Sequence, residues 1–316
     1  MTPVLQVSKQ RGLTLIELLV ALVISSVIAL AAFSAIVVSR QGFATVDAAS
    51  QLRDNARFAS DIIQRLALQT GYQDVAYAAT TRVGSASAVA PNVFGFTNGT
   101  PSSTDPLNTF TTNTASAAGY GSDVLVLRYQ TVETFPGSGV SDRSIIDCFG
   151  TAETAMPVNR DDRLGSVLYV AESQGEPSLM CKTHNASTTA QPLVQGVENF
   201  QVLYGVDPDN DSIADRYMRA DQLTIAGNDA ATNANWRMVR SIKIGLILRS
   251  AVGATQETAT RTWYPFGVAR ASASGASGSA FSNATNDPGT VFNAPADRRL
   301  RQQTSFTIHL RNEQNL

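Results

Sequence analysis

The 316-residue chain is 43% hydrophobic but only 16% charged, whereas about a quarter of the residues in a typical soluble domain are charged. Its 24 Lys and Arg residues against 26 Asp and Glu residues give a net charge of -2, so no basic excess points to nucleic acid as a partner. Its 2 cysteines exclude a disulfide-dense scaffold and a four-thiolate zinc site, but they allow one bridge in a chain that leaves the cytoplasm.

A short basic segment, Met1 to Gly12, precedes a long apolar run. Residues Leu13 to Ser39 contain a single charge, Glu17. Because a helix needs about 20 apolar residues to cross a bilayer, this run predicts a transmembrane helix. An ordinary secretory signal is the alternative, since Ala29-Leu30-Ala31 has the form of a signal-peptidase site, but the apolar pattern continues through Val38.

Glu17 is unusual in such a segment, because an ionisable group in hydrocarbon is costly and usually has a partner or a function. The string Lys9-Gln10-Arg11-Gly12-Leu13-Thr14-Leu15-Ile16-Glu17 and the apolar run after it resemble the class III signal of type IV pilins and type II secretion pseudopilins. The resemblance implies that prepilin peptidase cuts between Gly12 and Leu13, that Leu13 is then N-methylated, and that Glu17 assists assembly.

The new ammonium at Leu13 can pair with Glu17 of an adjacent subunit, and neutralising both charges makes their burial in a filament core tolerable. Because the implied cut falls after Gly12, residues 1–12 are expected to be a leader peptide. A plain membrane anchor with a stray glutamate is the alternative.

The helical pattern continues without proline from Gln41 to Thr70, and Gly71 is a natural stop. One helix is expected over residues 13–70, with 13–39 in the membrane or filament core and 40–70 amphipathic. Arg57/Asp61 and Asp61/Arg65 are expected to form weakly stabilising pairs on the charged face. The apolar face comprises Leu52, Ala56, Ala59, Ile62 or Ile63, and Leu66.

Residues 71–316 alternate between β-rich stretches and segments rich in Gly, Ser, Asn and Pro, which predicts a β-rich head. The near-continuous apolar segment Met238–Ser250 predicts a central strand, and Thr304–Arg311 alternates as a half-buried strand does. Further strands are expected at Asp123–Glu133, Ser144–Phe149, Ser166–Glu172, Ser178–Lys182 and Phe200–Val206. The fold class is thus α+β, a long helix packed on a mostly antiparallel β-sheet or sandwich head.

Two stretches rich in small polar residues, Arg82–Tyr120 and Ala269–Asn293, are expected to be exposed loops, either solvated insertions or partner surfaces.

Segments later in the chain point to one group among the pilins and pseudopilins. The Gly71-Tyr72 break, the segment from Val197 through Glu198 to Asp207, the strand Val239–Arg249 and the terminal Arg301–Asn312 together resemble PilW-type minor pilins. The J-type pseudopilin of type II secretion is similar in plan. The resemblance implies two β-sheets against the helix. It also implies, as partners, other minor pilins, the major pilin, prepilin peptidase and an inner-membrane assembly platform.

An acidic segment follows the strand that ends near Val206. Asp207, Asp209, Asp211 and Asp215 take positions 1, 3, 5 and 9 of a calcium loop, whose alternate residues direct oxygens at one centre. Ser212 departs from the glycine preferred at position six, and Met218 replaces the glutamate at position 12. Calcium is one interpretation and an Asx-rich hairpin tip is the other; in either case no cofactor is required.

Cys148 and Cys181 are expected to form a disulfide, because the head lies in the periplasm under this topology. His184 follows Cys181 closely, but Cys148, Cys181 and His184 together supply only three ligands, and a closed zinc site needs four. His184 and His309 are the chain's 2 histidines, and no nucleophile elbow, phosphate loop or His-Glu-x-x-His motif is present. The sequence therefore predicts no enzyme.

The function expected is that of a minor pilin that primes or caps type IV pilus assembly, at the inner membrane first and then in the pilus, at its tip. A J-type pseudopilin and a pilus-tip adhesion module are the alternatives.

Overall fold

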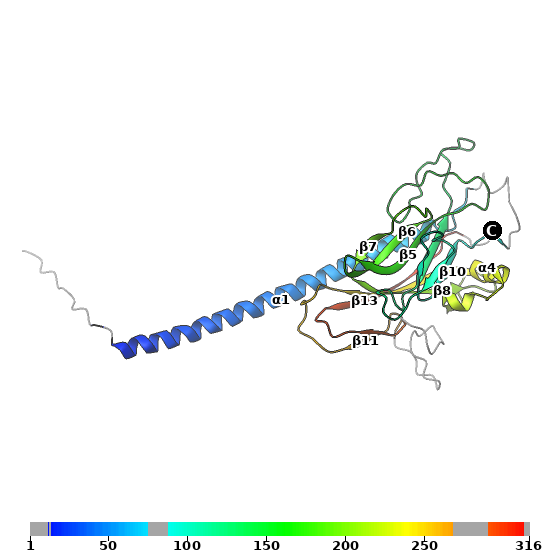
Figure 1. The fold of residues 1–316 in the computed structure, drawn as a ribbon. Helices are drawn as coiled ribbons and strands as arrows, with labels where there is room; N and C mark the ends of the chain where they lie inside the picture. Colours follow the sequence, from blue (N-terminus) through cyan, green and yellow to red (C-terminus); the bar gives the residue numbers. More distant parts are fainter. Residues whose placement is uncertain (1–11, 13, 75–87, 268–289, 313–316) are drawn as a thin grey trace, which may run out of the picture. The chain divides into compact units, whose positions relative to one another are not determined.

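The computed structural model describes residues 12, 14–74, 88–267 and 290–312. The chain divides into two compact units, Met1–Asp47 and Ala48–Leu316. Helix α1, Leu15–Gln69, runs through the boundary (Figure 1). The predicted long N-terminal helix followed by a β-rich head is confirmed.

The first unit is the apolar part of α1. Every described side chain from residue 14 to residue 44 is exposed, and among the described residues α1 alone is long and apolar enough to cross a membrane. The hydroxyls of Ser25, Ser26 and Ser34 donate to backbone carbonyls three or four residues earlier. These hydroxyls are therefore compatible with lipid, where every polar group must find an internal partner.

In the second unit, α1 buries the predicted apolar face, with Ile63 in the core and Ile62 at its edge. The prediction that Asp61 pairs with Arg57 and Arg65 is wrong, because no ion pair joins Asp61 to either arginine among the described residues. An exposed pair of this spacing gains only about 0.2–0.5 kcal/mol, too little to fix three long side chains in one geometry.

Two antiparallel sheets form the head, as the resemblance implied. The five-stranded sheet has the order β1-β4-β5-β6-β7 and the four-stranded sheet the order β13-β10-β8-β9; β11 pairs with β12 and β2 with β3. The strands are β1 Val93–Phe96, β2 Gly99–Pro101, β3 Phe110–Thr112, β4 Val124–Tyr129, β5 Leu164–Ser173, β6 Glu176–Thr183, β7 Gln191–Gln195, β8 Val197–Val206, β9 Arg216–Met218, β10 Val239–Arg249, β11 Arg261–Trp263, β12 Phe292–Ala294 and β13 Arg301–His309.

Strand β10 is central, as predicted, with β8 on one side and β13 on the other. The strand expected at Ser144–Phe149 is wrong, since only an isolated bridge joins Ile146 to Ala152. The carboxylate of Asp147 accepts the backbone N–H groups of Phe149 and Thr151. These bonds turn the chain back on itself where a strand would have to continue.

The loop expected at Arg82–Tyr120 is wrong in part. Strands β1, β2 and β3 lie within it, although residues 82–87 fall outside the described part. Gly95 of β1 lies against the Tyr204 hydroxyl so closely that a Cβ would collide with it, which explains a glycine within a strand. Of Ala269–Asn293, residues 269–289 lie outside the described part.

Two short helices, α3 (Ala220–Leu223) and α4 (Asp229–Arg237), were not expected. Asn228 caps α4 by accepting the N–H of Ala231. Trp236 of α4 is fully buried, with its ring centroid 4.8 Å from that of Phe94 and 4.6 Å from that of Tyr204. These ring contacts connect β1, β8 and α4.

Candidate functional site

Glu17 lies in the first turn of α1, close behind Gly12. Its Oε2 accepts the backbone N–H of Thr14 at 2.9 Å and the Thr14 hydroxyl at 3.0 Å, while that hydroxyl lies 3.3 Å from the N of Glu17. This is a capping box, in which the first and fourth residues satisfy each other's donors. The sequence Thr14-Leu15-Ile16-Glu17 carries its signature, which our sequence interpretation missed. Gly12 is exposed, and Leu13 lies outside the described residues.

The predicted disulfide is confirmed. Cys148 and Cys181 are bonded, with their Cα atoms 6.0 Å apart, and both are buried. Cys181 belongs to β6, whereas Cys148 follows the Asp147 turn, so the bridge fastens an irregular segment to the five-stranded sheet. Because both cysteines are in the disulfide, neither is a thiolate that could bind zinc.

A small cluster of titratable groups lies beside the disulfide. Oε1 of Glu153 is 3.5 Å from Nδ1 of His184 and within 3.5 Å of the Tyr129 hydroxyl. Burial, and then the nearby charge of Asp147, raise the pKa of Glu153 to about 7. Burial lowers the pKa of His184. The Tyr129 hydroxyl also bonds that of Ser166, which is fully buried and so out of reach of a substrate.

The acidic loop brings together three of the four predicted ligands. Carboxylate oxygens of Asp207, Asp209 and Asp215 lie within 4.8 Å of one another, and Asp211 is not part of this group. Asp207 is buried, and its Oδ2 lies 3.2 Å from Nε of Arg240. Arg240 therefore supplies positive charge to the loop that an ion would otherwise supply.

The backbone of the same loop is bent by its first carboxylate. Asp207 accepts the N–H groups of Asp211 and Ser212. Ser212 has a φ of +70°, a left-handed conformation that glycine adopts without strain. Position six is thus the point where this loop departs from calcium loops in residue type while keeping a backbone that favours glycine. Calcium binding here stays a prediction.

An ion-pair network joins the two sheets. It comprises three arginines and three carboxylates: Arg249, Arg299, Arg301, Glu176, Glu198 and Asp297. We call these six residues the arginine cluster. Burial alone would raise the pKa of Glu176, but bonds from Arg299 and Arg249 lower it. The bond from Arg301 likewise lowers the pKa of Asp297.

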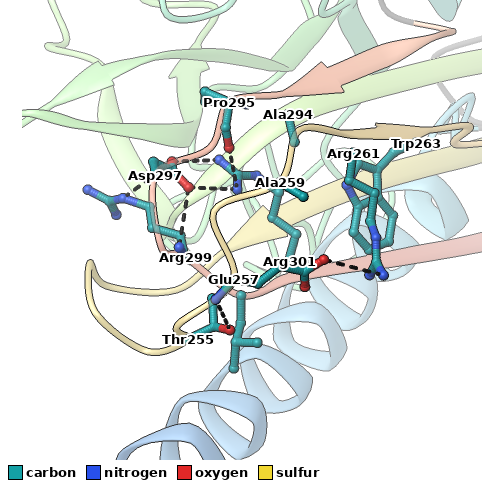
Figure 2. Close-up of a pocket in the computed structure, with 11 residues that line it drawn as sticks. Thr255, Glu257, Ala259, Arg261, Trp263, Ala294, Pro295, Asp297, Arg299 and Arg301 are labelled. Carbon is teal, nitrogen blue, oxygen red and sulfur yellow. Dashed lines mark hydrogen bonds and ion pairs between the residues drawn. The ribbon is translucent and has the colours of Figure 1, made fainter.

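Figure 2 shows Arg299 and Arg301 converging on Asp297 at one side of a cavity of about 70 Å³. On the other side, the guanidinium of Arg261 lies 5.8 Å from the ring centroid of Trp263 and pairs with Glu257 at 3.8 Å. Positive and negative charges balance within the arginine cluster, so its chemistry suits fastening the head rather than capturing an ion.

Two families match separate parts of the chain. Residues 7–33 match the prokaryotic N-terminal methylation motif, and residues 167–312 match the family described as type IV pilus-assembly protein W. The chain thus carries a pilin methylation motif and a PilW domain. A type IV-like pilin from Thermus thermophilus is similar over 83% of this chain and 98% of its own, at 13% identity and a TM-score of 0.39. No curated protein matches it.

The W-family match contains the whole four-stranded sheet and all six residues of the arginine cluster. The methylation motif contains Gly12 and Glu17. As a pilin, the protein is a membrane-anchored pilus component that works with other pilus components, and the pilin family is structural.

Proposed function

We propose that this PilW-type pilin is cut between Gly12 and Leu13 by prepilin peptidase and methylated on Leu13. The first part of α1 then holds it in the inner membrane with the head in the periplasm. It enters the type IV pilus as a minor subunit that primes or caps assembly, beside other minor pilins and the major pilin on the assembly platform. We assign it no catalytic activity.

The observation that carries this proposal is the place of Glu17. It is an exposed carboxylate in the first turn of a helix whose apolar side chains have no cover within their own unit. A charge placed so in hydrocarbon needs a partner. The Leu13 ammonium of a neighbouring subunit is a partner that exists only after cleavage, so processing and assembly are linked by one ion pair.

The disulfide supports a periplasmic head, because such bonds form and persist in oxidising compartments. A head of 246 residues, 71–316, is also large for a subunit repeated along the shaft, which favours the tip.

The deciding experiment is deletion of the gene in a strain that cannot retract pili, with surface pili and secreted enzymes measured together. Loss of pili with normal secretion, restored by the wild-type gene, is the expected result. Normal pili with blocked secretion would assign the protein to a type II secretion system instead. No change in either would contradict the assembly role.

A matched pair of variants tests Glu17 itself. Glu17→Gln keeps an acceptor oxygen for Thr14 but loses the charge, whereas Thr14→Val loses the capping hydroxyl and keeps the charge. We expect Glu17→Gln to reduce the amount of this chain in sheared pili far more than Thr14→Val does. Equal effects would mean that helix capping, rather than charge, is what Glu17 contributes.

A further inference from the structure

An open groove of about 680 Å³ lies along the exposed side of α1 in the second unit. Its walls come from three places that are distant in the sequence. One is the last turns of α1, another is the segment at residues 144–145, and the third is the chain just after β13. The lining residues include Asp61, Arg65, Leu68, Ile145 and Arg311.

Hydrogen bonds hold these walls in place. Gln69 donates from Nε2 to the carbonyl of Ile146 at 2.5 Å, and its Oε1 lies 3.5 Å from the N of Ile146. Asn312 donates from Nδ2 to the carbonyl of Thr70 at 2.9 Å. The end of α1 is thus fastened to both other walls, and the groove is formed before anything enters it.

The charges in the groove have no partners of their own. Arg65, Arg311 and Asp61 make no hydrogen bond or ion pair through their side chains within the part of the chain that the structure describes. The groove therefore has one more positive than negative charge. Leu68, 42% exposed, lies among them and offers apolar surface to an occupant.

We propose that this groove docks an acidic segment of a different, neighbouring pilin subunit, with carboxylates at Arg65 and Arg311 and an apolar side chain at Leu68. Guanidinium groups bind carboxylates through paired, charge-assisted hydrogen bonds. Because Arg65 and Arg311 have no partner among the described residues, both can bind carboxylates of another chain. One wall of the groove is the end of α1, the helix whose first part anchors the protein in the proposed function. The inference rests on the proposed assembly role.

The test exploits the scarcity of lysine, of which the chain has three: Lys9, Lys182 and Lys243. Arg65→Lys keeps the charge and places an amine in the groove. A water-soluble carbodiimide joins that amine to a touching carboxylate as an amide, with loss of water. Arg57→Lys is the matched control, because Arg57 is exposed on the same helix but does not line the groove.

Full-length variants are crosslinked in sheared pili from a non-retracting strain, and the joined peptides are identified by mass spectrometry. We expect Lys at position 65 to join an Asp or Glu of another pilin, at least tenfold more than Lys at position 57 does. Equal yields would overturn the proposal. Joining to Asp209, Asp211 or Asp215 of an isotope-labelled second copy would overturn the stated occupant.

A second measurement separates this inference from the assembly role. Arg65→Glu combined with Arg311→Glu should lower the chain's content in pili about tenfold, the effect of losing roughly 1.4 kcal/mol, while Arg57→Glu should leave it unchanged. Suppose that the wild-type chain is in pili, but Arg65→Lys crosslinks no more than Arg57→Lys and the double glutamate variant enters pili normally. Docking in the groove is then wrong and the assembly role stands. If the wild-type chain is absent from pili, the assembly role is wrong, and crosslinking is scored on membranes.

Discussion

Arg301 of β13 binds Glu198 of β8 across the central strand β10, with Nε of the arginine 2.6 Å from Oε2 of the glutamate. Both side chains are nearly buried, at 5% and 6% exposure. Arg249, at the end of β10, reaches the same glutamate at 3.0 Å. The W-type resemblance in the late head rested on the segments that form β8, β10 and β13. One charged residue from each of these strands meets at the Glu198 carboxylate.

Removing that carboxylate should destabilise the head strongly. Glu198→Ala leaves three arginines with two carboxylates in the arginine cluster, and breaking a buried pair costs about 3–5 kcal/mol. Urea unfolding of the detergent-solubilised chain measures the loss. Glu257→Ala is the control, because its pair with Arg261 is exposed, and such pairs contribute about 0–1 kcal/mol. Similar losses in both variants would show that the cluster does not fasten the sheets.

Sequence reasoning succeeded where local pattern decides the structure. The apolar run without proline predicted α1, and the near-continuous apolar segment Met238–Ser250 predicted β10. It failed where a single side chain acts on the backbone, as at Ser144–Phe149, where Asp147 turns the chain. It also missed Arg240, which reaches Asp207 from 33 residues away, because the pairing depends on how β8 and β10 align.

The disulfide should stabilise the head by roughly 3–4 kcal/mol, because it closes a long loop in the unfolded chain. Its cysteines are 33 residues apart. Unfolding of the Cys148→Ala, Cys181→Ala double variant should occur at lower urea concentration than that of the oxidised wild type. Reduced wild type serves as the control and should unfold near the double variant. An unchanged midpoint on reduction would contradict a stabilising role for the bridge.

The stability of the head should fall as pH rises through the range set by Glu153. Its pKa in the folded head is raised to about 7 from an ordinary value of 4.5. Between these two values the folded head holds a proton that the unfolded chain has lost, so stability decreases with pH. The lowered pKa of His184 acts oppositely below 6.5.

Glu153→Gln isolates the carboxyl, since the amide keeps its shape and does not titrate. The variant should gain stability relative to wild type at pH 8 and little at pH 4.5, measured by thermal unfolding across that range. A constant difference between variant and wild type at every pH would assign the effect to packing rather than to ionisation.

The acidic loop provides the last prediction, in which Arg240 and calcium compete for Asp207. Arg240 occupies Oδ2 of Asp207. The pKa of Asp209 is raised by the hydrogen bond between the Asp209 and Asp207 side chains, then by burial and by the charge of Asp211. The carboxylates therefore repel one another even with Arg240 present. Arg240→Ala leaves Oδ2 with the Ser212 N–H and removes the compensating charge. Millimolar calcium should therefore raise the Tm of Arg240→Ala more than that of wild type.

Two controls make the result specific. Asp215→Asn, added to Arg240→Ala, removes one of the three grouped carboxylates and should abolish the calcium-dependent rise in Tm. Magnesium should act more weakly, because it demands near-ideal octahedral geometry and gives up its water reluctantly. If calcium shifts the Tm of neither the wild type nor Arg240→Ala, the loop is an Asx-rich turn closed by its own backbone bonds, and the calcium prediction is wrong.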